Sequence, residues 1–140
     1  MVFCPDASAL LPFLLPEEPP AEAIGEFWST LWRRGDRLVA PPLLFAEITS
    51  VLRRYVHTGT ILHEEAVSAL TQLFQLRLSV VNDPDLYLRA LELSRQLGQP
   101  KAYDVQYLAV AEYQGCPVVT LDRDLYESAR TLGIAARLLA

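Results

Sequence analysis

Four acidic residues lie at positions where a carboxylate can do chemistry. Asp6 ends the first apolar run of the chain, and Asp122 follows a later one, Pro117–Thr120. Glu47 and Asp104 lie instead within predicted helices, on or beside their apolar faces. A carboxylate at the edge of an apolar face is costly to bury unless something pairs with it. This placement favours one shared site over a set of separate surface charges.

Grouped carboxylates are suited to bind a hard divalent cation. Two of them about 5 Å apart repel by roughly 3 kcal/mol at an effective dielectric of 20. Several in one crevice must therefore raise one another's pKa values or take up a cation. Oxygen ligands alone select Mg²⁺ or Mn²⁺ over zinc. Such an ion can neutralise negative charge that develops during a reaction and can activate water, without a nucleophilic side chain.

Each acid also has a local structural role open to it. Asp6 and Asp122 directly precede predicted helices, and aspartate is a good N-cap. Asp104 could cap a helix that begins one residue later, and Glu47 could extend to solvent or pair with Arg54. All of these local roles would have to hold together to remove the case for a shared site.

The elements that must position these residues alternate along the chain. Short apolar runs predict strands at Val2–Pro5, Arg37–Ala40, Ser79–Val81, Pro117–Thr120 and Ala135–Leu139. Helical spacing of apolar residues predicts helices at Ala7–Leu14, Ala21–Arg34, Pro42–Thr58, His63–Leu76, Pro84–Leu97, Ala102–Gln114 and Arg123–Leu132. Strands separated by helices predict an α/β fold, a parallel sheet with helices on both faces.

This architecture predicts where the acids point. Residues just past the carboxyl ends of parallel strands line the binding crevice of such a sheet, so Asp6 and Asp122 should face one edge. At 100° per residue, Glu47 falls about 60° from Leu44, on the inward face of its helix. Asp104 precedes Leu108 by four residues and so shares the inward face of that helix.

Length and composition indicate one globular domain spanning residues 1–140. Hydrophobic residues make up 51% and charged residues 21%, which excludes a disordered chain. The net charge of −5 argues against a strongly basic nucleic-acid clamp but permits a local basic rim. No apolar run approaches the ~20 residues of a membrane span. We therefore expect a cytoplasmic protein with no membrane contact.

The acids, in this order and with this alternation of strands and helices, resemble the PIN domain family. The closest resemblance is to the compact toxins of bacterial and archaeal VapBC-type toxin–antitoxin pairs, and it covers essentially all 140 residues. The matching motifs are Asp6-Ala7-Ser8-Ala9-Leu10, the helical run Glu47–Arg54 that begins with the second acid, Tyr103-Asp104-Val105-Gln106-Tyr107-Leu108-Ala109, and Thr120-Leu121-Asp122 with Leu125.

The resemblance implies a three-layer PIN-like fold whose five-stranded parallel sheet has the order 3-2-1-4-5, flanked by helices. It implies a metal-dependent endoribonuclease that uses Mg²⁺ or Mn²⁺, held by Asp6, Glu47, Asp104 and Asp122. Ser8 and Thr120 would help to orient ligands and water, and Asp124 is either an auxiliary ligand or an acid favoured by the helix dipole. The implied partners are an RNA substrate, a cognate antitoxin protein and a second copy of the chain in a homodimer.

Two questions stay open at the level of sequence. Cations near the motifs either form an RNA-binding rim or are ordinary solvated residues: Arg53, Arg54, Lys101, Arg123 and Arg130. A catalytically silent PIN-like module that binds RNA or protein is the alternative function.

Two other acidic α/β folds fit poorly. A receiver domain needs a lysine after the last strand, and none follows Lys101. A haloacid-dehalogenase-type phosphatase needs an aspartate where Ser8 stands.

Overall fold

A five-stranded parallel sheet forms the centre of the computed structural model, which describes residues 1–15 and 22–139. The strands are β1 (Val2–Pro5), β2 (Arg37–Ala40), β3 (Leu78–Val80), β4 (Val118–Thr120) and β5 (Ala136–Leu138). Their order is β3-β2-β1-β4-β5, which confirms the order that the family resemblance implied. The register pairs Cys4 with Val118 and Pro5 with Val119, so β1 and β4 end side by side.

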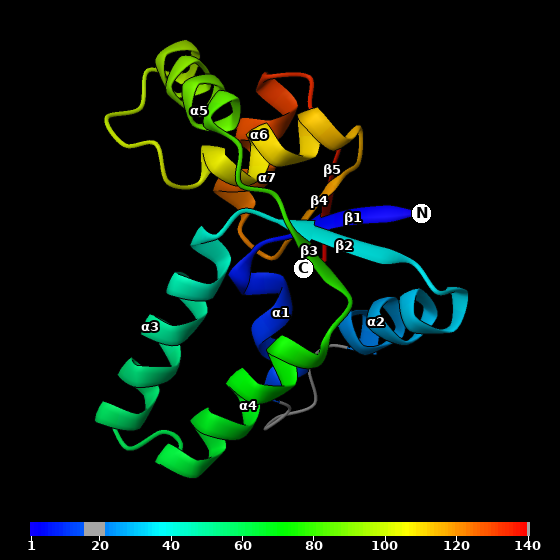
Figure 1. Ribbon diagram of the computed structural model, residues 1–140, viewed down its shortest axis with the longest axis vertical. Coiled ribbons are helices and arrows are strands. Elements are labelled where there is room, and N and C mark those ends of the chain that lie inside the picture. The colour runs from blue at the N-terminus through cyan, green and yellow to red at the C-terminus, as the bar shows by residue number, and fades with distance from the viewer. Residues whose placement is uncertain (16–21, 140) are drawn as a thin grey trace.

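Helices cover both faces of the sheet, as the alternation of elements predicted. They are α1 (Ala7–Leu14), α2 (Glu22–Arg34), α3 (Leu43–His57), α4 (His63–Gln75), α5 (Pro84–Leu97), α6 (Val105–Gln114) and α7 (Arg123–Thr131). Figure 1 shows α1 to α4 on one side of the sheet and α5 to α7 on the other. Within residues 1–15 and 22–139, no helix is both long and apolar enough to span a membrane.

One helix begins later than its apolar pattern predicted. The helix expected from Ala102 starts at Val105, and a turn precedes it. Backbone N–H groups of Gln106 and Tyr107 bond the carbonyls of Tyr103 and Asp104, three residues back. Because apolar spacing does not distinguish a tight turn from a first helical turn, the prediction extended the helix too far. The other boundaries agree within one residue, except that the expected start at Ala21 lies outside the described residues.

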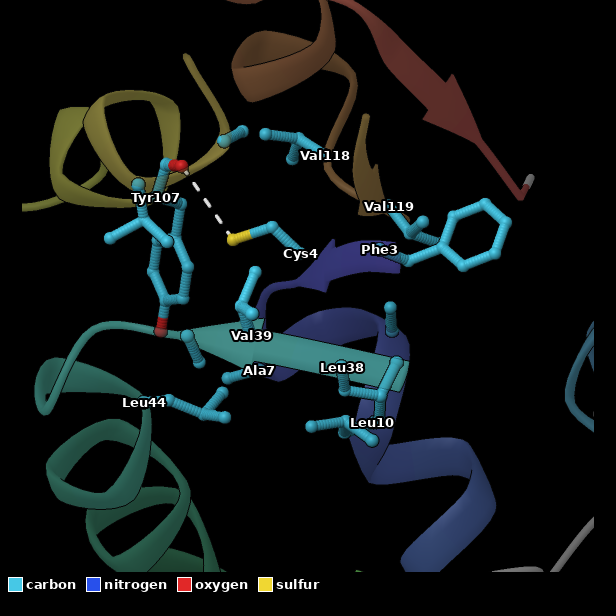
Figure 2. Packing of buried hydrophobic residues seen from close by; sticks show 14 of the residues in the cluster. Phe3, Cys4, Ala7, Leu10, Leu38, Val39, Leu44, Tyr107, Val118 and Val119 are labelled. Atoms are coloured by element: carbon cyan, nitrogen blue, oxygen red, sulfur yellow. Dashed lines mark hydrogen bonds between the residues drawn. The ribbon is translucent and has the colours of Figure 1, made fainter. Parts of the chain in front are cut away.

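The core packs against both faces of the central strands and holds their ends in place. Figure 2 shows side chains of β1, β2 and β4 meeting side chains of the surrounding helices, among them Leu10, Leu38 and Val118. These side chains are fully buried. On the α6 side, the thiol of Cys4 donates to the backbone carbonyl of Tyr107 at 3.6 Å. Close-packed protein interiors have low compressibility, so the strand ends form a rigid base for side chains placed there.

Candidate active site

Asp6 follows β1 directly and is nearly buried, with 7% of its surface exposed. Its Oδ1 accepts hydrogen bonds from the Ser8 hydroxyl at 2.7 Å and from the Ala9 backbone N–H at 3.1 Å. Its Oδ2 accepts from the Thr120 hydroxyl at 2.7 Å. Asp6 therefore caps α1, one of the local roles considered above, and also binds a residue on β4 that is 114 positions away.

The hydroxyls of Ser8 and Thr120 connect the ends of β1 and β4. Each has a single hydrogen, which it donates to Asp6. As acceptors, Ser8 Oγ takes the N–H of Leu121 and Thr120 Oγ1 takes the N–H of Asp122, both at 2.9 Å. The two hydroxyl oxygens lie 3.2 Å apart. The ends of β1 and β4 therefore meet as predicted, and hydrogen bonds through Ser8 and Thr120 join them.

Asp122 is exposed and caps α7. Its Oδ1 accepts from the backbone N–H groups of Asp124 at 2.9 Å and Leu125 at 3.4 Å. Asp124 is also exposed, in the first turn of α7. The local capping role of Asp122 holds, and it leaves Oδ2 without a hydrogen bond among the described residues.

Glu47 lies on α3 beside the buried stripe of Leu44, Ile48 and Leu52, and it is half-buried as its position predicted. Its Oε1 accepts a hydrogen bond from the hydroxyl of Tyr107 on α6, at 2.5 Å. The ion pair considered above, between Glu47 and Arg54, is not formed within the described residues. Glu47 is therefore directed toward α6.

Asp104 corrects a prediction. It was expected on an inward helical face, but it is the exposed residue that precedes α6 and makes no side-chain capping bond. The late start of α6 moves it from the first inward turn to the N-terminus of the helix. There its carboxylate is free of hydrogen bonds from the described residues, and the preceding Tyr103 is 59% exposed.

The four carboxylates are close enough to influence one another's ionisation. Burial raises the pKa of Asp6, hydrogen bonds from Ser8, Thr120 and Ala9 oppose the rise, and the negative charge of Asp122 adds to it. Burial also raises the pKa of Glu47, with further contributions from Asp104 and Asp6. The pKa of Asp104 is raised by desolvation and then by Asp122. Asp6, Asp104 and Asp122 thus each raise the pKa of at least one other acid of the set.

The donor set fits a hard divalent cation by its chemistry. It consists of carboxylates with hydroxyls beside them, and its mutual repulsion would be relieved by a positive ion. Within residues 1–15 and 22–139, no three histidine, cysteine, aspartate or glutamate side chains are placed closely enough to hold a metal ion. A cation held by three or more of these acids would therefore require their side chains to move closer together than they lie in this structure.

A groove of about 430 Å³ borders the acids. Glu47 and Asp104 line it together with Arg54 and Tyr103, and its remaining wall is Leu43, Ala46, Ser50 and Val51. A second hollow, of about 530 Å³, includes Ser8 and is otherwise mainly apolar. The first depression is thus lined by two of the acids, and the second by Ser8, which donates a hydrogen bond to Asp6.

Of the predicted cationic rim, Arg54 is the member that lines the acid groove. Its guanidinium carbon lies 5.9 Å from the centre of the Tyr55 ring. Arg53 borders a separate, mainly apolar hollow between α3 and α4. Lys101 and Arg123 are exposed, and among the described residues neither forms an ion pair. Arg130 packs over Tyr126 instead.

No role for Tyr103 or Tyr107 was predicted from the sequence, although both lie in the motif around Asp104. The available signal for Tyr107 was its spacing: it follows Asp104 by three residues, so it shares one side of the helix with that acid. It was also the only hydroxyl-bearing residue in an otherwise apolar run, Tyr107–Ala111. Tyr103 directly precedes Asp104, but nothing in the sequence distinguished a groove-lining tyrosine from an ordinary exposed one.

Several solved structures share this fold. The PAE2754 protein of Pyrobaculum aerophilum is 24% identical, with a TM-score of 0.71 over 97% of this chain and 92% of that one. VapBC-1 from nontypeable Haemophilus influenzae is 18% identical, with a TM-score of 0.68, and the match covers 99% of this chain and 98% of that one. VapC20 of Mycobacterium tuberculosis, a toxin that cleaves the sarcin-ricin loop, is 19% identical, with a TM-score of 0.67. The match covers 91% of this chain and 95% of that one. No curated protein matches the chain.

A family model places the chain by sequence. The model, described as PIN domain, matches residues 3–130 and so includes every acid of the site, from Asp6 to Asp122. The strand order and the placement of helices on both faces agree with that assignment. On these grounds the chain belongs to the PIN domain family.

Proposed function

We propose that this chain is a metal-dependent endoribonuclease that acts in the cytoplasm as the toxin of a type II toxin–antitoxin pair. The observation that carries the proposal is the buried Asp6, bonded to Thr120 across two strand ends and electrostatically coupled to Asp122. Membership in the PIN domain family supports nuclease chemistry. The fold shared with a toxin that cleaves the sarcin-ricin loop supports RNA as the substrate.

Each residue of the site has a role in this proposal. Asp6 and Asp104 would hold Mg²⁺ or Mn²⁺ directly, and Glu47 and Asp122 would hold it directly or through water. When bound, the ion supplies Lewis-acid stabilisation of the phosphate charge and activates water. Ser8 and Thr120 keep the Asp6 carboxylate in one orientation, because both of their protons are committed to it. Asp124 would serve as an auxiliary acid.

An RNA strand would lie along the groove beside the acids. Arg54 offers a cation to a flanking phosphate, and the exposed ring of Tyr103 offers a surface on which a base can stack. Arg53, Lys101 and Arg123 would extend the cationic rim. A local rim is compatible with the net charge of −5, since phosphate contacts depend on nearby charge more than on the total.

Protein partners are the second part of the proposal. Large apolar side chains are exposed on two helices, among them Phe74 on α4 and Leu88 and Leu91 on α5. Exposed apolar side chains of this size suit protein contacts. A cognate antitoxin and a second copy of the chain are the partners that we propose.

A ribonuclease assay with and without EDTA tests the function. We expect RNA cleavage with Mg²⁺ or Mn²⁺ and none with EDTA. Asp104→Asn should lower the rate by at least about 100-fold, because it removes a metal ligand, and it should leave the circular dichroism spectrum unchanged because Asp104 is exposed. Asp85→Asn, an exposed acid on α5, is the matched control. Equal cleavage by Asp104→Asn would contradict the site, and metal binding without cleavage would favour the catalytically silent module.

A further inference from the structure

Tyr107 is buried in α6, yet its hydroxyl bonds a residue of a different helix. The side chain is 1% exposed, and its Oη donates to Oε1 of Glu47 on α3 at 2.5 Å. The partners are 60 positions apart in the sequence. Figure 2 shows the ring pointing from α6 toward the end of β2, where the chain continues into α3. The bond therefore joins the helix that follows Asp104 to the helix that carries Glu47.

Packing alone does not account for this hydroxyl. A phenylalanine would fill the same apolar space, whereas a buried hydroxyl is costly unless it finds a partner. The backbone carbonyl of Tyr107 accepts a hydrogen bond from the Cys4 thiol, so the backbone that carries the ring is also fixed to β1. The hydroxyl end is thus held at a defined place, and the group that it meets there is a carboxylate of the candidate site. Hydrogen bonds from a hydroxyl to a carboxylate are short and strong.

The bond occupies one oxygen of Glu47 and leaves the other available. Oε1 accepts from Tyr107, and Oε2 makes no hydrogen bond within the described residues. A glutamate side chain that is free to rotate loses that freedom when it binds a metal, which weakens binding. A glutamate already held by Tyr107 has lost much of this freedom on folding. Partners that hold a ligand in this way typically change metal affinity by about 10–100-fold.

We propose that Tyr107 is a positioning residue of the metal site, which holds Glu47 so that Oε2 is presented to the cation. This inference rests on the proposed function, because it requires Glu47 to contribute to metal binding. Tyr107 does not contact the ion or the RNA, and it acts through Glu47 alone.

A double-mutant cycle with Mn²⁺ binding as the readout tests the proposal. The dissociation constant is measured by titration calorimetry for the wild type, Tyr107→Phe, Glu47→Gln and the double variant. Tyr107→Phe should bind Mn²⁺ about 10-fold more weakly. In the Glu47→Gln background, the same change should cost less than about 2-fold, since the carboxylate on which Tyr107 acts is gone. Tyr113→Phe, an exposed tyrosine on the same helix, should match the wild type.

Distinct results separate this inference from the proposed function. If the wild type binds Mn²⁺ and Tyr107→Phe binds it equally well, the positioning role is overturned and the proposed metal site stands. An equal loss in both backgrounds also overturns the role, because Tyr107 would then act through packing. If the wild type binds no Mn²⁺, both proposals fail together.

The wild-type chain offers a second test that needs no substitution. The Tyr107 hydroxyl proton should give a downfield NMR resonance because it is bonded to a carboxylate, and this resonance should shift when Mg²⁺ is added. A resonance that stays unchanged at saturating Mg²⁺ would overturn the proposal.

Discussion

At the scale of single residues, Thr120 is one of three hydrogen-bond donors that lower the pKa of Asp6 against the effect of burial. Thr120 is fully buried and donates the only hydrogen bond that reaches Asp6 Oδ2 from the described residues. Its oxygen also accepts the N–H of Asp122, so one hydroxyl holds both strand-end acids. A buried carboxylate is tolerated when donors of this kind compensate for lost hydration.

Removing this hydroxyl should therefore destabilise the fold. Thr120→Val keeps the shape of the side chain but leaves Asp6 Oδ2 and the Asp122 N–H without their partner. We expect a loss of about 1–3 kcal/mol in the free energy of unfolding, measured by urea denaturation. Thr71→Val is the matched control, because Thr71 is exposed on α4, and it should change stability by no more than about 0.5 kcal/mol. Similar losses in the two variants would contradict the role of Thr120.

At the scale of elements, α3 serves the core on one face and the groove on another. Its buried stripe is Leu44, Ile48 and Leu52, while Glu47 and Arg54 line the groove. Arg54 follows Glu47 by seven residues, which corresponds to about 10 Å along the helix axis. The helix thus places a cation at a fixed distance from the acids, where a neighbouring phosphate of a bound strand could meet it.

This geometry predicts how Arg54 contributes to RNA binding. Arg54→Ala should weaken the binding of single-stranded RNA for all sequences and should reduce the slope of log affinity against log salt by about 0.7, the value for one phosphate contact. The measurement is fluorescence anisotropy in EDTA, which prevents cleavage. Arg95→Ala removes the same charge from α5, where Arg95 pairs with Glu92, and it should leave the slope unchanged. A wild-type slope in Arg54→Ala would place the RNA elsewhere.

The sequence predicted the elements better than it predicted the side-chain partners. Short apolar runs identified every strand in the described part of the chain, and helical spacing of apolar residues identified every helix there, because buried parallel strands are uniformly apolar and half-buried helices repeat every 3.6 residues. The environment predicted for Asp104 was wrong, because apolar spacing does not reveal where a turn becomes a helix. The bond from Tyr107 to Glu47 could not be predicted, because it depends on how α3 and α6 pack, which no local pattern records.

At the scale of the whole molecule, strand order brings distant acids together. The residues alone predicted that Asp6 and Asp122 would face one edge of the sheet, but not that β1 and β4 would be neighbours. That adjacency came from the family resemblance, and the strand order confirms it. The result is a concentration of negative charge that the fold tolerates at some cost, which is a common property of functional sites.

That cost predicts a pH dependence. The folded-state pKa of Asp6 is raised, mainly by burial, so above that pKa the native state contains a carboxylate that is harder to ionise than in the unfolded chain. The stability associated with Asp6 is therefore highest below its unfolded pKa and falls as pH rises through the folded pKa. Asp6→Asn removes the charge, and its NH₂ group replaces one of the two acceptor oxygens. Without metal, the free energy of unfolding of Asp6→Asn relative to the wild type should therefore rise between about pH 4 and neutral pH.

Added metal should stabilise the wild type relative to Asp6→Asn. At 100 times its dissociation constant, Mn²⁺ should stabilise the wild type by about 2.7 kcal/mol, because it binds the folded state only. It should stabilise Asp6→Asn far less, since a carboxylate ligand has been lost. Urea denaturation at neutral pH and near pH 4, with EDTA or with Mn²⁺, measures all of these differences, and Asp85→Asn controls for net charge. A stability difference between the wild type and Asp6→Asn that stays the same from about pH 4 to neutral pH in EDTA would contradict the raised pKa of Asp6.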